Sequence, residues 1–222
     1  MLEPATDTLT GADPLPAVAA GGNANCRVTL PSAMENGATD EDLMLRYAAD
    51  DAAAFDRLYE RHRGGVYRYL LRQLHDRVLA EELFQDVWLN LVKARSRYSV
   101  RARFATYLYT LAHHRLIDHY RRSGRTVPIA ALGEDDDPPE AEIADDERHG
   151  PERQVLSQEQ GARLVALVER LPAPQREVFL LREEGGLSVD EIAAATGVSR
   201  EAAKSRLRYA YAKLQRGLRA YR

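Results

Sequence analysis

Basic and hydroxyl side chains gather on one side of a helical pattern near the C-terminus. In residues 199–214, small or apolar residues recur every three or four positions, which is the spacing of a helix's buried stripe. The stripe consists of Ala203, Leu207, Ala210 and Leu214, and it leaves Arg200, Lys204, Ser205 and Arg208 on the outer side. Guanidinium, ammonium and hydroxyl groups bind phosphate oxygens and the edges of bases. The pattern therefore favours contact with a DNA groove.

A second helical pattern and a tight turn come directly before this basic helix. Ser188 and Glu191 have the spacing of a capping box, which begins a helix that we expect to end near Thr196. Gly197 tolerates a positive φ angle, and Ser199 is placed to cap the helix that follows. The whole stretch is typical of a helix-turn-helix. A capped helical hairpin is also ordinary core architecture, so this motif alone leaves both interpretations open.

Three histidines, His113, His114 and His119, are the residues that would suggest a metal enzyme. Adjacent histidines on a helix point about 100° apart, however, and no set of histidines and carboxylates in the sequence has a familiar ligand spacing. The sequence contains no Walker A loop and no GxSxG elbow, and its single cysteine, Cys26, lies in the N-terminal tail. We therefore expect no metal, no other cofactor and no catalytic residues, so the protein is predicted not to be an enzyme.

Composition and charge narrow the remaining classes. The 222 residues are 45% hydrophobic, which suffices for one large core or two small ones. The sequence has neither a membrane-spanning apolar run nor a convincing secretory signal, so we expect a cytoplasmic protein without membrane insertion. The net charge of −3 is uneven, because residues 40–125 and 154–222 each carry +4 whereas residues 126–153 carry −8. Two mildly basic blocks are compatible with a polyanionic partner.

The N-terminal basic block begins with two helical patterns. Asp40 is placed to cap a helix over residues 41–49, and a second helix follows Asp51. Gly64 and Gly65 interrupt the middle of the second helix, where each glycine costs about 1 kcal/mol relative to alanine. We therefore expect this helix to bend or loosen at the glycine pair.

Two further helical patterns complete this block. Apolar residues at helical spacing predict helices over residues 77–95 and 104–122, with a loop over residues 97–103 between them. The sequence shows no credible strand-like alternation in this region. Residues 39–124 are therefore predicted to form a four-helix, all-α domain.

The flanking segments have a different composition. Residues 1–38 are rich in Ala, Gly, Pro, Thr and Asn, which predicts a disordered arm, and Met34 is a candidate natural start of translation. Residues 125–153 contain EDDDPPEAE and ADDE and are predicted to form an acidic, flexible linker. Helical periodicity resumes near Val155, so residues 154–222 are predicted to be a second small all-α domain that ends in the helix-turn-helix.

That second domain contains a short helix before the helix-turn-helix. Pro174 suits the first turn of a helix that includes Val178, Phe179 and Leu181. Gly185 and Gly186 are expected to end it.

Five stretches occur in a characteristic order along the chain. They are AFDRLYERHRGGVYRYLLR, AEELFQDVWLNLVK, FATYLYTLAHHRLIDHYRR, then after the acidic linker LPAPQREVFLL and LSVDEIAAATGVSREAAKSRLRYAYAKL. This order resembles an extracytoplasmic-function (ECF, group IV) sigma factor of the sigma-70 family. The resemblance implies a sigma-2 domain over residues 39–124 and a sigma-4 domain over residues 154–222, in a protein that directs core RNA polymerase to specific promoters. The implied partners are core RNA polymerase, promoter DNA and an anti-sigma protein.

The resemblance also assigns a polymerase-binding face. Its residues would meet the clamp helices of the largest polymerase subunit, while the flap of the second-largest subunit would be a further contact. The matching positions are Glu81, Glu82, Gln85, Asp86 and Leu89. On pattern alone, a solvated acidic face over a bundle core is the other interpretation.

The fourth helix and the loop before it would read the minus-10 promoter element on the non-template strand. Tyr98 matches an aromatic position that helps to hold a flipped base, for which stacking and hydrogen bonds are the suitable interactions. Tyr107 replaces the common Trp and His114 the common Asn, and the second change alters the available donors and acceptors. The matching positions are Tyr98, Tyr107, His114, Arg115, His119, Arg121 and Arg122.

The helix-turn-helix would read the minus-35 element in the major groove. The matching positions are Arg200, Lys204, Ser205, Arg206, Arg208 and Tyr209. The acidic linker would pass through the active-site and RNA-exit region of the polymerase, or act only as a solvated tether.

A second class of protein fits the helix-turn-helix as well. A transcriptional regulator whose N-terminal domain binds a signal or another protein would bind a duplex operator by itself. A sigma factor instead binds weakly alone and opens promoters only with core polymerase.

Overall fold

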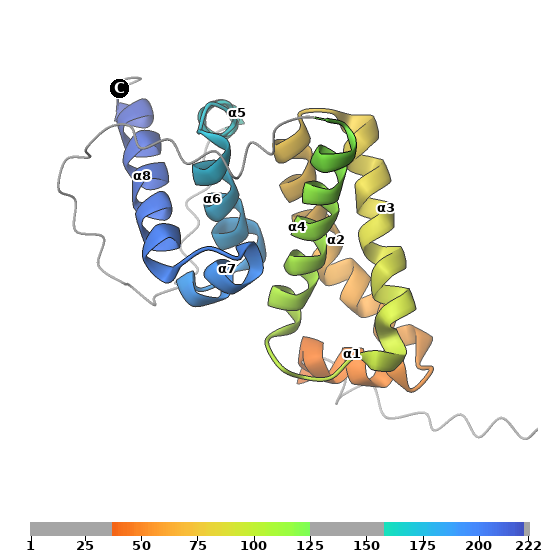
Figure 1. Ribbon diagram of the computed structural model, residues 1–222. Helices are drawn as coiled ribbons and strands as arrows, with labels where there is room; N and C mark the ends of the chain where they lie inside the picture. The colour runs from red at the N-terminus through yellow and green to blue at the C-terminus, as the bar shows by residue number, and fades with distance from the viewer. Residues whose placement is uncertain (1–36, 125–157, 220–222) are drawn as a thin grey trace, which may run out of the picture. The chain divides into compact units, whose positions relative to one another are not determined.

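The computed structural model describes residues 37–124 and 158–219, and every regular element in these residues is helical (Figure 1). The elements are α1 (Asp40–Ala48), α2 (Ala52–Leu74), α3 (Arg77–Ala94), the 3-10 turn η2 (Arg95–Arg97), α4 (Phe104–Arg122), α5 (Gln158–Glu169), α6 (Ala173–Gly185), α7 (Val189–Thr196) and α8 (Arg200–Arg219). The predicted all-α class is confirmed. Within the same residues, no helix has the length and hydropathy needed to cross a bilayer.

The described residues from Ala38 onwards belong to one compact unit. The proposed start at Met34, nearly all of the predicted N-terminal arm and the acidic linker lie outside the described residues. The exact domain boundaries therefore stay predictions.

The start of α1 differs from the prediction by one residue. Thr39, not Asp40, is the N-cap, because its hydroxyl accepts a hydrogen bond from the Asp42 amide at 3.1 Å. Asp42 completes a capping box by accepting from the Thr39 amide at 3.3 Å. Asp40 instead turns its carboxylate to α2, where it lies 2.7 Å from Arg61 Nη1 and 2.7 Å from His62 Nε2. The prediction was wrong because Asp and Thr are both good caps, and tertiary contacts decided between them.

The α2 helix runs without a break through Gly64 and Gly65, so the glycine pair does not interrupt it. Close packing explains why a glycine occupies position 65. A Cβ atom at this position would lie 2.6 Å from the Tyr109 hydroxyl and 3.0 Å from the backbone oxygen of Glu184. The absent side chain therefore allows α2 to approach both α4 and the end of α6.

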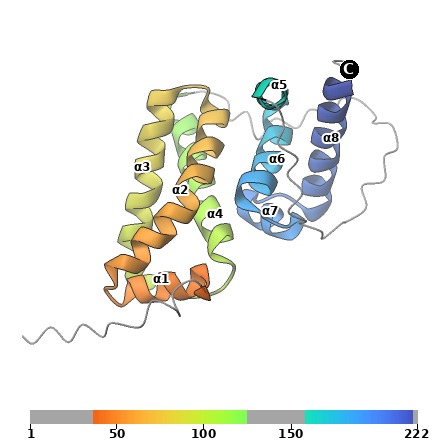
Figure 2. The same cartoon turned by 180° about the vertical axis from the view of Figure 1, so that it is seen from behind.

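The N-terminal helices enclose an apolar core. Figures 1 and 2 show α2, α3 and α4 running alongside one another, with α1 across one end. Between α2 and α3, the rings of Tyr59 and Trp88 lie 4.9 Å apart and those of Phe55 and Trp88 lie 5.8 Å apart. Phe104 at the start of α4 is fully buried. Aromatic contacts thus join the two central helices, while α4 is anchored at its first residue.

The predicted helix-turn-helix is confirmed in its local details. Ser188 and Glu191 form the capping box of α7 with hydrogen bonds of 3.2 and 2.8 Å. Gly197 ends α7 with φ at 70°, which is the left-handed conformation that the turn requires. Ser199 then accepts a hydrogen bond from the Ala202 amide at 3.1 Å at the start of α8. The predicted inner stripe of α8 is buried at Ala203, Leu207, Ala210 and Leu214.

The short helix before this motif also matches its prediction. Pro174 lies in the first turn of α6, and Gly186 follows its last residue with φ at 61°.

Buried polar groups join α6 to α2 and α4. Glu177 of α6 is fully buried, and its Oε1 lies 2.5 Å from His113 Nδ1 and 3.3 Å from the Tyr69 hydroxyl. Nearby, Arg68 and Arg72 of α2 both form ion pairs with Glu184. Buried polar contacts therefore add to the apolar packing of α6 against α2 and α4.

Candidate nucleic-acid interface

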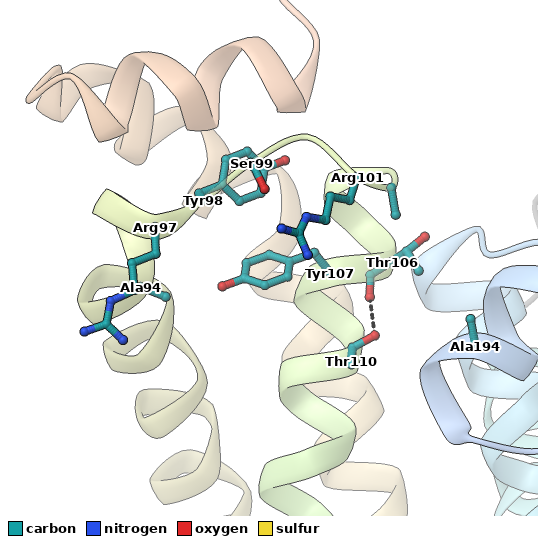
Figure 3. A pocket seen from close by; sticks show the side chains of 10 residues that line it. Ala94, Arg97, Tyr98, Ser99, Arg101, Thr106, Tyr107, Thr110 and Ala194 are labelled. Carbon is teal, nitrogen blue, oxygen red and sulfur yellow. Dashed lines mark hydrogen bonds between the residues drawn. The ribbon is translucent and has the colours of Figure 1, made fainter.

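A pocket of about 460 Å³ lies where η2, the following loop and the first turns of α4 meet. Tyr98 from the loop and Tyr107 from α4 both line it, with ring centroids 5.5 Å apart and planes inclined by 59°. Figure 3 shows the Arg101 side chain reaching toward the Tyr107 ring. Two aromatic faces and a guanidinium group can stack on and hydrogen-bond to a planar, polar ligand.

Both tyrosines are partly removed from water. Burial, together with the nearby charge of Glu41, raises the pKa of Tyr98 to about 12, and burial also raises the pKa of Tyr107. The Tyr98 hydroxyl is buried and has no hydrogen-bond partner among the described residues. Both phenols are neutral at physiological pH and can serve as donors.

Two threonines form the other side of the pocket. The Thr110 hydroxyl donates to the Thr106 backbone oxygen at 2.7 Å, while the Thr106 hydroxyl donates to Glu191 of α7 at 2.7 Å. Arg103 also reaches α7, at 3.4 Å from Glu191 Oε2, and donates to the Gly186 backbone oxygen at 3.0 Å. The capping glutamate of the helix-turn-helix therefore has a second set of contacts beside this pocket. Sequence periodicity carries no signal for such long-range pairs.

The remaining residues predicted to read the minus-10 element form a stripe along α4 rather than a cluster. His114 follows Tyr107 by seven residues and is exposed on about the same side, roughly 10 Å along the axis. Arg121 and Arg122 are exposed near the end of the helix, roughly 20 Å from Tyr107. Of the residues predicted to read the minus-10 element, only Tyr98 and Tyr107 line the pocket, and Arg101 is an additional lining residue.

Two of these α4 residues already have intrahelical neighbours. Arg115 lies 3.8 Å from the Asp118 carboxylate, and the rings of His119 and Tyr120 have centroids 5.9 Å apart. Partial desolvation of the ring lowers the pKa of His114, and the neighbouring His113 acts in the same direction. His114 is therefore predominantly neutral at neutral pH, with one ring nitrogen as a donor and the other as an acceptor.

The predicted polymerase-binding residues share an exposed side of α3. Gln85 and Asp86 each lie three or four residues from both Glu82 and Leu89, and Leu89 is 52% exposed. Glu81 lies toward one border and is 3.2 Å from Arg77. The structure adds two exposed apolar residues along this side, Val78 and Val92. Both residues are at helical spacing from Leu89, and this spacing could have indicated from the sequence that they lie on the same side.

The basic residues of α8 lie on more than one side of the helix. Arg200, Lys204 and Arg208 follow at intervals of four and share a side, and Arg208 lies over the Tyr209 ring at 5.6 Å. Arg206 lies about 200° around the helix from Lys204, so it is separated from that row. Arg200 is 2.7 Å from Asp190 of α7 in an exposed ion pair.

Metal ligation has no support in the described ranges. Across residues 37–124 and 158–219, no group of three His, Cys, Asp or Glu side chains could hold a metal ion. His113, one of the histidines that could have suggested such a site, is buried against Glu177.

These features define a class of all-α proteins with a helix-turn-helix and an aromatic pocket on a helical bundle. Comparison with known families agrees. The model of Sigma-70 region 2 matches residues 58–126, and the model of Sigma-70, region 4 matches residues 161–214.

Curated relatives carry the same description. The chain is 33% identical to the ECF RNA polymerase sigma factor SigD of Mycobacterium tuberculosis, over 75% of this chain and 78% of SigD. It is 31% identical to the RNA polymerase sigma factor CarQ of Myxococcus xanthus, over 78% of this chain and 93% of CarQ. It is also 31% identical to the ECF RNA polymerase sigma factor BldN of Streptomyces coelicolor, over 79% of this chain but only 64% of BldN.

Solved structures share the fold. The sigma factor RpoE of Bartonella quintana, solved with the anti-sigma factor NepR, has a TM-score of 0.55 and 20% identity, over 76% of this chain and 98% of RpoE. CnrH, solved with the cytosolic domain of CnrY, has a TM-score of 0.56 and 22% identity, over 82% of this chain and 97% of the solved chain. The chain therefore belongs to the ECF RNA polymerase sigma factors of the sigma-70 family.

Proposed function

We propose that this chain binds core RNA polymerase through α3 and directs it to promoters whose minus-10 and minus-35 elements are read by α4 and α8. The observation that carries the proposal is the pocket formed by Tyr98, Tyr107 and Arg101. Its volume of about 460 Å³ falls within the range of about 300–1,000 Å³ for small-ligand sites. An unstacked base needs an aromatic surface and polar groups at its edge, and this pocket offers both.

Each of the other two surfaces has a matching role. The α3 face combines carboxylates with exposed Leu89 and Val78, and such a mixed face suits a partner helix. The row of Arg200, Lys204 and Arg208 suits a major groove, where guanidinium groups bind guanine edges or phosphates. His114, Arg115, His119, Arg121 and Arg122 would extend contact with the single strand along α4.

Further partners follow from membership of the family. An anti-sigma protein is a proposed regulator, and the flap of the second-largest polymerase subunit is a proposed second contact. The polymerase would supply the bond-forming chemistry, so we propose no catalytic residue and no cofactor in this chain, and we propose that it acts in the cytoplasm.

Run-off transcription with purified core polymerase and a promoter library tests the proposal. We expect specific initiation from a subset of promoters and only weak duplex binding by the free protein. Tight operator binding by the free protein, together with no initiation from any promoter, would favour the helix-turn-helix regulator instead.

The pocket itself is tested by two substitutions in the same assay. Tyr98→Ala and Arg101→Ala should reduce initiation and alter preference at one minus-10 base. Val100→Ala is the matched control, because Val100 is 52% exposed on the same loop but does not line the pocket. Equal activity of all three variants would exclude the pocket as the base site.

A further inference from the structure

The promoter-reading helix α4 does not cap its own N-terminus. Its N-cap residue, Arg103, makes no side-chain capping hydrogen bond. The Phe104 amide donates instead to Glu41 Oε1 of α1 at 2.6 Å, across 63 residues of sequence. Free amides at a helix start carry partial positive charge, so a carboxylate is a strong partner for them. The α1 helix therefore supplies the missing cap.

Each acidic residue in the first turn of α1 has a different partner. Asp40 faces Arg61 and His62 of α2, and Asp42 closes the capping box of α1 itself. Glu41 contacts the start of α4. The sequence TDED thus contains one cap for its own helix, one contact to α2 and one cap for α4.

The other end of the pocket loop is also held from α1. Arg95 of η2 lies 2.7 Å from the Asp50 carboxylate, two residues beyond the end of α1. The Arg95 guanidinium also lies over the ring of Tyr47, a buried residue of α1, at 5.3 Å from its centroid. The loop that carries Tyr98 and Arg101 therefore begins after Arg95, which is held by Asp50 and Tyr47, and ends at Phe104, which is held by Glu41.

We propose that α1 is a clamp on the promoter-reading loop, with Glu41 as the positioning residue at its α4 end and Arg95 as the residue gripped at its η2 end. Holding both ends restricts the loop to conformations in which the Tyr98 ring stays beside the Tyr107 ring. Positioning therefore acts through the two rings and not by contact of Glu41 with DNA. The proposal rests on the proposed function of the pocket as a base reader.

Amide hydrogen exchange in the free, full-length protein tests the clamp without polymerase. In Glu41→Ala, the Phe104 amide should exchange about tenfold faster, as expected for loss of a charge-assisted hydrogen bond. Asp42→Asn is the matched control, because it changes an acid in the same turn whose hydrogen-bond partner is Thr39, the N-cap of α1. Unchanged exchange at Phe104 in Glu41→Ala would overturn the clamp.

Base discrimination by the reconstituted holoenzyme tests what the clamp does. The ratio of run-off rates between two promoters that differ at one minus-10 base measures discrimination. Glu41→Ala should reduce this ratio about tenfold, which is the size of one weakened base contact. Glu41→Gln keeps an acceptor oxygen and should restore most of the discrimination, and binding to a minus-35 duplex should stay unchanged in both variants.

Arg95→Gln keeps the test decisive if Glu41→Ala does not fold at the assay temperature, because it releases the opposite end of the loop. Equal loss of rate from all promoters, with discrimination intact, would show a purely structural role and overturn the proposal. Absence of initiation by the unsubstituted holoenzyme would refute the proposed function, whereas the exchange result would still decide whether Glu41 clamps the loop.

Discussion

Gly65 of α2 lies against the backbone of Glu184 in α6, where a Cβ atom would be 3.0 Å from the Glu184 carbonyl oxygen. Its neighbour Gly64 has no such constraint, since a Cβ there would meet only the flexible end of Arg68, at 3.1 Å. The two glycines therefore stand next to each other for different reasons. One is a site of close helix approach, and the other carries only the helix penalty of glycine.

Alanine substitutions should separate these two glycines. We expect Gly64→Ala to raise the free energy of unfolding by about 1 kcal/mol. Gly65→Ala should lower it by about 1–3 kcal/mol despite the same gain in helix propensity, because the new methyl group overpacks the contact. Urea denaturation measures both, and equal stabilisation by the two variants would contradict the close approach. Repeating the pair in a Tyr109→Phe background removes the other clash and isolates the Glu184 backbone.

The buried pair of Glu177 and His113 should be energetically coupled. Replacing His113 by Ala leaves the fully buried Glu177 carboxylate without its 2.5 Å neighbour, so we expect a loss of about 3–5 kcal/mol. The double variant His113→Ala with Glu177→Leu should lose less than the sum of the single variants. A double-mutant cycle by chemical denaturation measures this coupling. Additive losses would mean that the two side chains do not interact in solution.

Asp40 should make the protein sensitive to acid. Burial disfavours the ionised carboxylate, but hydrogen bonds from His62 and Arg61 outweigh it and hold the pKa of Asp40 below its ordinary value. A depressed folded-state pKa contributes stability above the unfolded-state pKa and loses it as pH falls, here from about pH 4 downwards. Asp40→Asn should therefore flatten the dependence of stability on pH between about pH 5 and 2. The control is Asp56→Asn, which replaces an exposed acid on α2. Stability should fall more steeply with acid in Asp56→Asn than in Asp40→Asn.

The exposed leucine of α3 should matter for polymerase and not for folding. Leu89→Asp is expected to weaken binding to core polymerase at least about tenfold, since it places a charge in the apolar part of the contact. Leu45→Asp introduces the same change at a leucine of similar exposure, 45% against 52%, on α1. Fluorescence competition for core polymerase compares the two variants. Similar affinities would remove α3 from the interface.

Salt dependence should distinguish the roles of Lys204 and Arg208. We expect Lys204 to contact a phosphate. Lys204→Ala should therefore weaken binding to all promoter sequences alike and reduce the salt slope of binding by about 1. Arg208→Ala should instead reduce discrimination at a minus-35 base pair by about 1–3 kcal/mol. Holoenzyme binding to variant promoters at several salt concentrations measures both. Uniform weakening by Arg208→Ala would make that residue a phosphate clamp too.

Local features of this chain were predictable because their physical causes lie within a few residues. Ser188, Glu191 and Gly197 act on amides and φ angles in their own turn, and the apolar stripe of α8 follows from helical periodicity alone. The exposed side of α3 could be assigned for the same reason. The choice of Thr39 over Asp40 as the N-cap of α1 could not be predicted, because both residues suit the position and Asp40 binds Arg61 and His62 of α2 instead.

The long-range partners were decided by tertiary structure. Nothing in the sequence near Glu41 indicates that it caps Phe104, and nothing near Glu177 indicates that this carboxylate is buried beside His113. Gly65 carried only a helix penalty until the Glu184 backbone was placed against it. Periodicity and capping rules describe how a segment folds and which face it buries, whereas the partner of a single polar group depends on how distant helices pack.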